Sequence, residues 1–114
     1  MKVPLVSAPV ATYWYTNVPA IMMGLIVERV YGRPLDEVAR TQLFEPLGMR
    51  HSTFSPAVSG RADVAPTEIQ ADGEVRGRVN DEYAWAIKMA GGRSGAAGRF
   101  VTSGDLMRIG QVQL

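Results

Sequence analysis

The chain has 114 residues, of which 46% are hydrophobic and 20% are charged, a composition typical of one ordinary soluble domain. Twelve Lys and Arg against eleven Asp and Glu give a formal net charge of +1, which provides no positive excess for binding nucleic acid or an anionic membrane. The absence of cysteine and the single histidine exclude disulfides, thiolate nucleophiles and the usual zinc sites, so we expect no metal and no cofactor.

The N-terminal segment begins with a positive charge, but its apolar residues do not form the continuous core of a signal peptide. Pro4 and Pro9 interrupt it, and we predict an extended lead-in. The longest apolar stretch, Val18 to Val27, has about ten residues where a bilayer requires roughly 20. The sequence therefore predicts no membrane-spanning helix.

The first predicted helix covers residues 18 to 31. Its apolar residues recur with helical spacing at Val18, Ile21, Met22, Leu25 and Ile26, and Met23 and Val27 widen this stripe. Asn17 stands at the N-cap position, Pro19 lies in the first turn and Gly32 follows the last turn. Because apolar side chains cover almost the whole surface of this helix, we predict that it is buried.

A second helix is predicted from about Pro34 to Leu43. Acidic residues lie in its first turn, where they suit the helix dipole, and Pro46 follows its end. Residues 47 to 66 are richer in Gly, Pro and Ser and lack periodicity, which indicates connecting structure packed on the surface.

The next segment predicts a short β-hairpin. Glu68-Ile69-Gln70 and Glu74-Val75-Arg76 flank Ala71-Asp72-Gly73, and Asp-Gly is a common hairpin turn. The two strands would be short and would mostly face solvent.

Two further helices are predicted in the last third of the chain. One covers residues 81 to 89 and is closed by Gly91-Gly92, and the other begins near Ser103, a candidate N-cap. The stretch from Gly91 to Gly98 between them is rich in glycine, and we interpret it as a flexible connection close to a cleft.

The strongest local signal for chemistry is Tyr15-Thr16-Asn17 at the start of the first helix. A phenol and an amide two residues apart can both point into one cleft, the first to exchange a proton and the second to hold a substrate amide. The structural alternative is that Asn17 caps the helix while Tyr15 packs beneath it. The tripeptide alone does not decide between these interpretations.

Other polar and aromatic residues are better explained by structural roles. The lone imidazole of His51 is predicted to lie on the surface or to pack a loop. The pair Asp81-Glu82 could perform acid/base chemistry, but at a helix start it more often complements the dipole. Trp14 and Trp85 could line a cleft, although plain packing is the favoured interpretation.

A series of short motifs makes the chain resemble a known family. In order, they are Tyr15-Thr16-Asn17, Tyr31-Gly32-Arg33-Pro34-Leu35, Phe44-Glu45-Pro46-Leu47-Gly48-Met49, Ser52-Thr53-Phe54, Ala65-Pro66-Thr67-Glu68, Gly77-Arg78-Val79-Asn80-Asp81-Glu82, Ala97-Gly98-Arg99-Phe100 and Thr102-Ser103-Gly104-Asp105-Leu106. This series resembles the middle of the class C β-lactamase-like and penicillin-binding-protein-like serine hydrolases. The resemblance extends from about Trp14 onward, although Asn80 and Ala96 stand where relatives often carry His.

The resemblance implies an acyl-transfer site built from three motifs: a Ser-x-x-Lys nucleophile, a Tyr-x-Asn, and a Lys-Thr-Gly or His-x-Gly segment. By resemblance, Tyr15 is the catalytic proton-transfer residue and Asn17 contacts the substrate. None of the six serines is followed three places later by lysine, and neither Lys2 nor Lys88 lies in a Lys-Thr-Gly. A Gly-x-Ser-x-Gly elbow is also absent. We therefore interpret residues 1–114 as a partial domain, with the nucleophile motif upstream and the third motif downstream.

The resemblance implies a mainly α segment with a short β-hairpin, the helical part of the α/β serine β-lactamase-like, or transpeptidase-like, fold. It implies a serine hydrolase that acts on amide, ester or β-lactam bonds of a small molecule or peptide, and an exported parent protein. We expect the 114 residues alone to be inactive. The alternative is a non-catalytic helical module for binding or oligomerisation, because a shortened domain would leave the apolar first helix partly uncovered.

Overall fold

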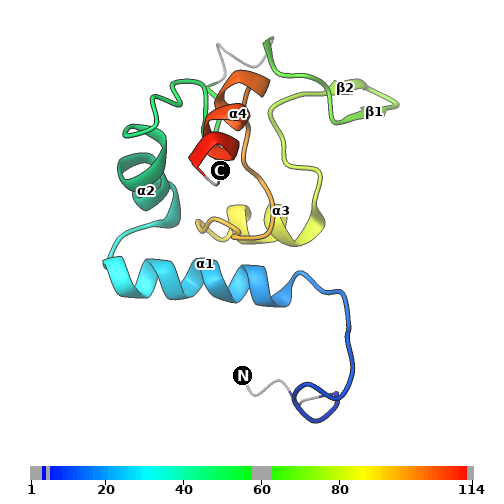
Figure 1. Ribbon diagram of the computed structural model, residues 1–114. Coiled ribbons are helices and arrows are strands. Elements are labelled where there is room, and N and C mark those ends of the chain that lie inside the picture. The colour runs from blue at the N-terminus through cyan, green and yellow to red at the C-terminus, as the bar shows by residue number, and fades with distance from the viewer. Residues whose placement is uncertain (1–3, 5, 58–62, 113–114) are drawn as a thin grey trace.

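The computed structural model describes residues 4, 6–57 and 63–112 and is mostly helical with one β-hairpin, which agrees with the predicted secondary-structure class. Figure 1 shows the elements in chain order. They are α1 (Val18–Tyr31), α2 (Leu35–Ala39), the π-helix η1 (Arg40–Phe44), β1 (Glu68–Gln70), β2 (Gly73–Val75), α3 (Glu82–Met89) and α4 (Ser103–Val112).

The segment before α1 differs from the predicted extended lead-in. Part of that segment lies outside the described residues, and residues 6 to 12 form bends and turns. The amide of Ala11 donates to the carbonyl oxygen of Ala8 at 3.2 Å, and Val10 has a positive φ of 67°. Residues 13 to 16 have no regular secondary structure and lead into the start of α1.

Helix α1 begins and ends where the sequence predicts. Pro19 lies in its first turn, where the missing amide proton is not needed. Gly32 follows its last residue with a φ of 64°, a left-handed conformation that favours glycine, and its amide donates to the carbonyl oxygen of Glu28 at 2.8 Å. The local signals are therefore sufficient to place this helix.

The predicted burial of α1 is wrong. Gly24 is its buried residue, whereas the stripe residues Val18, Met22, Leu25 and Ile26 are exposed, Leu25 to 57%. In Figure 1 the elements that follow α1 lie along one side of it, and the segment that precedes it extends on the other side. Helical periodicity identifies an apolar face, but it does not supply the partner that would cover that face.

The loop of residues 94–98 makes a close contact with α1. A Cβ atom built on Gly95 would lie 2.3 Å from the carbonyl oxygen of Ala20 and 3.0 Å from the amide nitrogen of Gly24. Ser94, at the start of the loop, is buried, and its hydroxyl accepts a hydrogen bond from the amide of Ala96. The loop predicted to be a flexible connection is thus packed, backbone against backbone, on α1.

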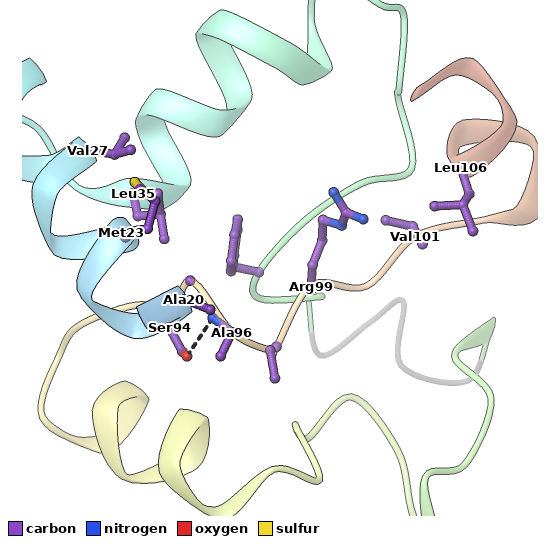
Figure 2. Close-up of a pocket in the computed structure, with 14 residues that line it drawn as sticks. Ala20, Met23, Val27, Leu35, Ser94, Ala96, Arg99, Val101 and Leu106 are labelled. Carbon is purple, nitrogen blue, oxygen red and sulfur yellow. Dashed lines mark hydrogen bonds between the residues drawn. The ribbon is translucent and has the colours of Figure 1, made fainter. Parts of the chain in front are cut away.

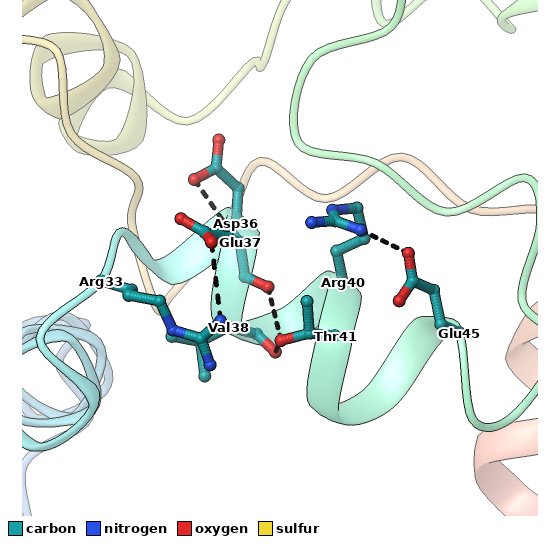
Figure 3. A network of polar contacts seen from close by, with 7 residues as sticks. All are labelled: Arg33, Asp36, Glu37, Val38, Arg40, Thr41 and Glu45. Atoms are coloured by element: carbon teal, nitrogen blue, oxygen red, sulfur yellow. Dashed lines mark hydrogen bonds and ion pairs between the residues drawn. The ribbon is translucent and has the colours of Figure 1, made fainter.

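The predicted second helix is present but changes its geometry halfway. After α2, the amide of Glu45 donates to the carbonyl oxygen of Arg40, five residues back, at 2.9 Å, which defines the π-helical turn η1. Figure 3 shows the polar contacts along this segment, among them an ion pair between Arg33 and Glu37 at 3.5 Å and another between Arg40 and Glu45. The side chains of these pairs are 37% to 57% exposed, so each pair contributes little to stability.

The predicted hairpin is confirmed, with the second strand beginning one residue early. Strands β1 and β2 are antiparallel, with Glu68 opposite Val75 and Gln70 opposite Gly73. Ala71 and Asp72 form the turn, and Gly73 adopts a φ of 125° that few other residues could accept. Both strands are mainly exposed to solvent, as expected.

The core is small, and none of its buried apolar side chains comes from α1. Its buried apolar side chains are Val38, Phe44, Met49, Val79 and Ala84. The chain exposes 8814 Å² of surface, where a compact monomer of 12.4 kDa would expose about 6,100 Å². Its radius of gyration is 16.1 Å against about 13 Å expected for a compact domain of this length. The fold is therefore more open than an independent domain of this size.

Hydrogen bonds connect α4 to the segment that follows η1. The carboxylate of Asp105, which is 4% exposed, accepts from the amide of His51 at 2.8 Å and from the hydroxyl of Ser52 at 3.0 Å. A two-way backbone bridge between Thr53 and Phe100 continues the same connection.

Among the described residues, no helix is long and apolar enough to span a bilayer.

Candidate functional site

The Tyr15-Thr16-Asn17 segment lies where the chain enters α1, and the N-terminal turn of α3 lies beside it. A pocket of about 330 Å³ is lined by residues of both segments. Its lining consists of Tyr15, Thr16, Asn17, Val18, Ile21 and Tyr83. The structure therefore brings both predicted site residues, Tyr15 and Asn17, to one pocket and adds Tyr83 from α3.

Asn17 occupies the N-cap position of α1, but its side chain makes no capping hydrogen bond. The hydroxyl of Thr16 instead accepts from the amide of Val18 at 3.3 Å, which satisfies one of the free donors at the start of the helix. The backbone carbonyl of Asn17 still accepts from the amide of Ile21 at 3.0 Å. The side chain of Asn17 is consequently available for a longer-range contact, and the simple capping interpretation is wrong.

That contact is with Asp81. The amide nitrogen Nδ2 of Asn17 donates to Oδ2 of Asp81 at 3.3 Å, across 64 residues of chain. The other carboxylate oxygen, Oδ1, accepts from the backbone amide of Ala84 at 2.7 Å and caps α3. One carboxylate thus connects the start of α3 to the start of α1.

Tyr15 does not pack beneath the helix, as the structural alternative proposed. Its side chain is 83% exposed, and Tyr83, which shares the pocket, is also mainly exposed. Both phenol rings are accessible to a molecule entering the pocket. Sequence reasoning missed Tyr83, because nothing in the Asp81-Glu82-Tyr83 segment distinguishes a pocket residue from one on the surface of a helix.

The chemistry of the pocket follows from its polar groups. Tyr15 and Tyr83 supply hydroxyls that donate and accept protons, Thr16 supplies a third hydroxyl, and Asn17 supplies an amide. The lining contains no Lys, Arg, His, Asp or Glu. The arrangement can orient a polar substrate and exchange a proton with it, but it holds no Ser-Lys pair to serve as an activated nucleophile.

A second and larger hollow lies on the inner side of α1 and is shown in Figure 2. Its volume is about 680 Å³, and its walls come from α1, the beginning of α2, the 94–98 loop and α4. Apolar side chains such as Met23, Leu35 and Leu106 dominate the lining, with Arg99 as the charged member. This hollow contains neither Tyr15 nor Asn17, so it is not the candidate site.

The other residues singled out from the sequence have structural surroundings. His51 is exposed and uses its backbone amide to bond Asp105. Trp85 is half-buried with the guanidinium of Arg78 4.7 Å from its ring centre, whereas Trp14 is exposed, contrary to the predicted packing. Within the described ranges, His, Asp and Glu side chains do not cluster as a metal site would require.

Comparison with known proteins identifies the family. A family model described as Beta-lactamase matches residues 1–114. Proteins named "Putative D-alanyl-D-alanine carboxypeptidase" from Salmonella schwarzengrund (strain CVM19633) and Salmonella paratyphi B (strain ATCC BAA-1250 / SPB7) are 34% and 33% identical to the chain. Each alignment covers 99% of this chain and 29% of the relative, so the chain spans less than a third of these relatives. The chain belongs to the Beta-lactamase family.

Proposed function

We propose that this chain supplies the Tyr-x-Asn part of a serine hydrolase that acts through an acyl-enzyme on amide, ester or β-lactam bonds. The observation that carries the proposal is the shared pocket of Tyr15 and Asn17 in a chain that matches the Beta-lactamase family along its whole length. The relatives' names add D-alanyl-D-alanine peptides as the substrate class to test first.

Tyr15 is the proposed proton carrier. As a serine oxygen bonds to the substrate carbonyl carbon, the hydroxyl proton must leave, and a phenol oxygen beside the reacting atoms can accept it while the phenol's own proton passes to a neighbouring base such as the lysine of a Ser-x-x-Lys motif. The same group then returns the proton to the leaving nitrogen or oxygen as its bond to carbon breaks. The high exposure of Tyr15 leaves its oxygen accessible for this exchange.

Asn17 is the proposed substrate-orienting residue. The bond to Asp81 uses only one of the two amide protons of Asn17. The amide oxygen and the second amide proton can therefore accept from and donate to a substrate amide. The position on a helix start, rather than on a free loop, limits how far this amide can move.

The proposed function also implies that the 114 residues alone do not hydrolyse substrate, because their sequence has no Ser-x-x-Lys. The test is the addition of a chromogenic β-lactam or a p-nitrophenyl ester to the purified chain. We expect no burst and no turnover above the uncatalysed rate. A burst that is abolished by Tyr15→Phe would overturn the statement about inactivity.

Substrate recognition can be tested without turnover. N-acetyl-D-alanyl-D-alanine added to the isotopically labelled chain should shift the nuclear magnetic resonance signals of Tyr15, Asn17 and Tyr83. Asn17→Ala should weaken this binding roughly fivefold, the equivalent of about one hydrogen bond. Gln42→Ala, an exposed amide in η1, is the matched control. Shifts confined to other parts of the chain would contradict the proposed site.

A second candidate function, a helical module for binding or oligomerisation, is favoured by the exposed apolar stripe of α1. Leu25 and Ile26 are both more than half exposed on this face. Patches of this kind often mark interaction surfaces. Sedimentation equilibrium over a range of concentrations tests it: association that Leu25→Glu and Ile26→Glu abolish would support the module, and a monomer at every concentration would count against it.

A further inference from the structure

We propose that Asp81 is a positioning residue for Asn17, fixing the orientation of its amide in the pocket. The inference rests on the proposed function, because it assigns Asp81 a role in the same site. The starting observation is the hydrogen bond from Nδ2 of Asn17 to Oδ2 of Asp81 at 3.3 Å. Both side chains are half-buried, so water competes less with this bond than it would on an open surface.

The carboxylate determines which way the Asn17 amide faces. An ionised carboxylate only accepts hydrogen bonds, so the NH₂ group of Asn17 must face Asp81 and the amide oxygen Oδ1 must face away from it. Without Asp81, the amide could turn over and exchange its donor and acceptor positions. Asp81 therefore selects one of two orientations that have nearly the same shape but opposite hydrogen-bonding character.

Asp81 is itself held in place. Its Oδ1 accepts from the amide of Ala84 at 2.7 Å as the N-cap of α3, and this fixes Oδ2 toward Asn17. Thr16 takes over local hydrogen bonding at the start of α1, which leaves the Asn17 side chain uncommitted there. The bonds of Thr16 and Asp81 together place the amide at a junction of two helix starts.

Two substitutions separate positioning from helix capping. Asp81→Ser retains a side-chain oxygen able to cap α3 but is too short to serve both partners, so it should release Asn17. An asparagine at position 81 can also cap α3 through its side-chain oxygen. Its NH₂ group would then face the NH₂ group of Asn17, so Asp81→Asn should favour the turned-over orientation in which the Asn17 amide oxygen faces residue 81. Glu82→Gln removes the same charge at the next, exposed residue and is the matched control.

The first measurement uses the free 114-residue chain and requires no ligand. Exchange of the Asn17 side-chain amide protons with water should accelerate roughly fivefold in Asp81→Ser and should not change in Glu82→Gln. The backbone amide of Ala84 should stay protected in all variants, which confirms that α3 is intact. An unchanged Asn17 exchange rate in Asp81→Ser would overturn the proposal.

The second measurement is a double-mutant cycle of N-acetyl-D-alanyl-D-alanine affinity. Asp81→Asn should weaken binding roughly fivefold to tenfold in the native background and should have almost no effect in the Asn17→Ala background. An equal loss in both backgrounds would show that Asp81 does not act through Asn17. If the native chain binds no peptide, the proposed function fails for this ligand, while the exchange measurement still decides the Asn17–Asp81 relation.

Discussion

Replacing Gly95 by alanine is expected to loosen the attachment of α1 to the rest of the chain. The added Cβ would lie 2.3 Å from the carbonyl oxygen of Ala20 and 3.0 Å from the amide nitrogen of Gly24. Both are backbone atoms of α1, which cannot rotate aside as a side chain could. The loop must therefore move away from the helix or the helix must shift.

The expected cost can be estimated from overpacking in other proteins, which destabilises by about 1 to 3 kcal/mol. Gly95→Ala should lie at the upper end of this range, because the contact at 2.3 Å is well inside the carbon–oxygen van der Waals distance. Gly24→Ala should cost less: its nearest contact is 3.0 Å, and alanine gains about 1 kcal/mol over glycine inside a helix. The two substitutions thus separate steric clash from helix propensity.

Urea denaturation followed by circular dichroism measures the free energy of unfolding of each variant. Gly110→Ala in α4 is the control, because a Cβ there has no neighbour within 4 Å and should stabilise slightly. Gly95→Ala with the same stability as the native chain would refute the argument that the glycine loop is packed against α1. So would a Gly24→Ala variant that is destabilised more than Gly95→Ala.

Three smaller predictions follow from single contacts. Asp105→Ala should lower the free energy of unfolding by about 2 to 3 kcal/mol in the same urea assay, because two donors lose their acceptor at a buried site. Arg78→Ala should lower it by about 0.5 to 1 kcal/mol and alter Trp85 fluorescence, since the guanidinium lies 4.7 Å from the ring centre. Gly32→Ala should cost about 1 to 2 kcal/mol by thermal denaturation, and the cause must be its φ of 64°, because the space around it is open.

The sequence was sufficient to predict most helix boundaries, because the signals for them are local. Pro19 and Gly32 delimit α1 as predicted, and α3 begins at Glu82, one residue after the predicted start. Helix α4 begins at Ser103, near the predicted start, but the hydroxyl of Thr102 rather than that of Ser103 accepts from the amide of Asp105 and caps it. The π-helical turn η1 was not predictable, since no local residue preference distinguishes it from continued α-helix. The burial of α1 was predicted wrongly because burial depends on a partner surface, which periodicity cannot supply.

The candidate site shows the same division between local and distant information. The proximity of Tyr15 and Asn17 to one pocket could be expected from their spacing at a helix start. The bond from Asn17 to Asp81 could not, because it joins residues 64 positions apart and each side chain had an adequate local role, Asn17 as a cap and Asp81 as a complement to the helix dipole. The structure shows that Thr16 carries a local hydrogen bond at α1. Residue preferences for the N-cap position favour Asn17, and they do not predict that Thr16 makes the local hydrogen bond in its place.

The position of the pocket depends on contacts that are few and small. Helix α1 lies largely outside the core, and the close approach of Gly24 and Gly95 sets its distance from the 94–98 loop. The bond between Asn17 and Asp81 then relates its first turn to α3. A shift of α1 on the loop would move Asn17 relative to Asp81, so Gly95→Ala should accelerate exchange of the Asn17 side-chain amide protons as Asp81→Ser does. Destabilisation by Gly95→Ala without faster Asn17 exchange would show that the two contacts act independently.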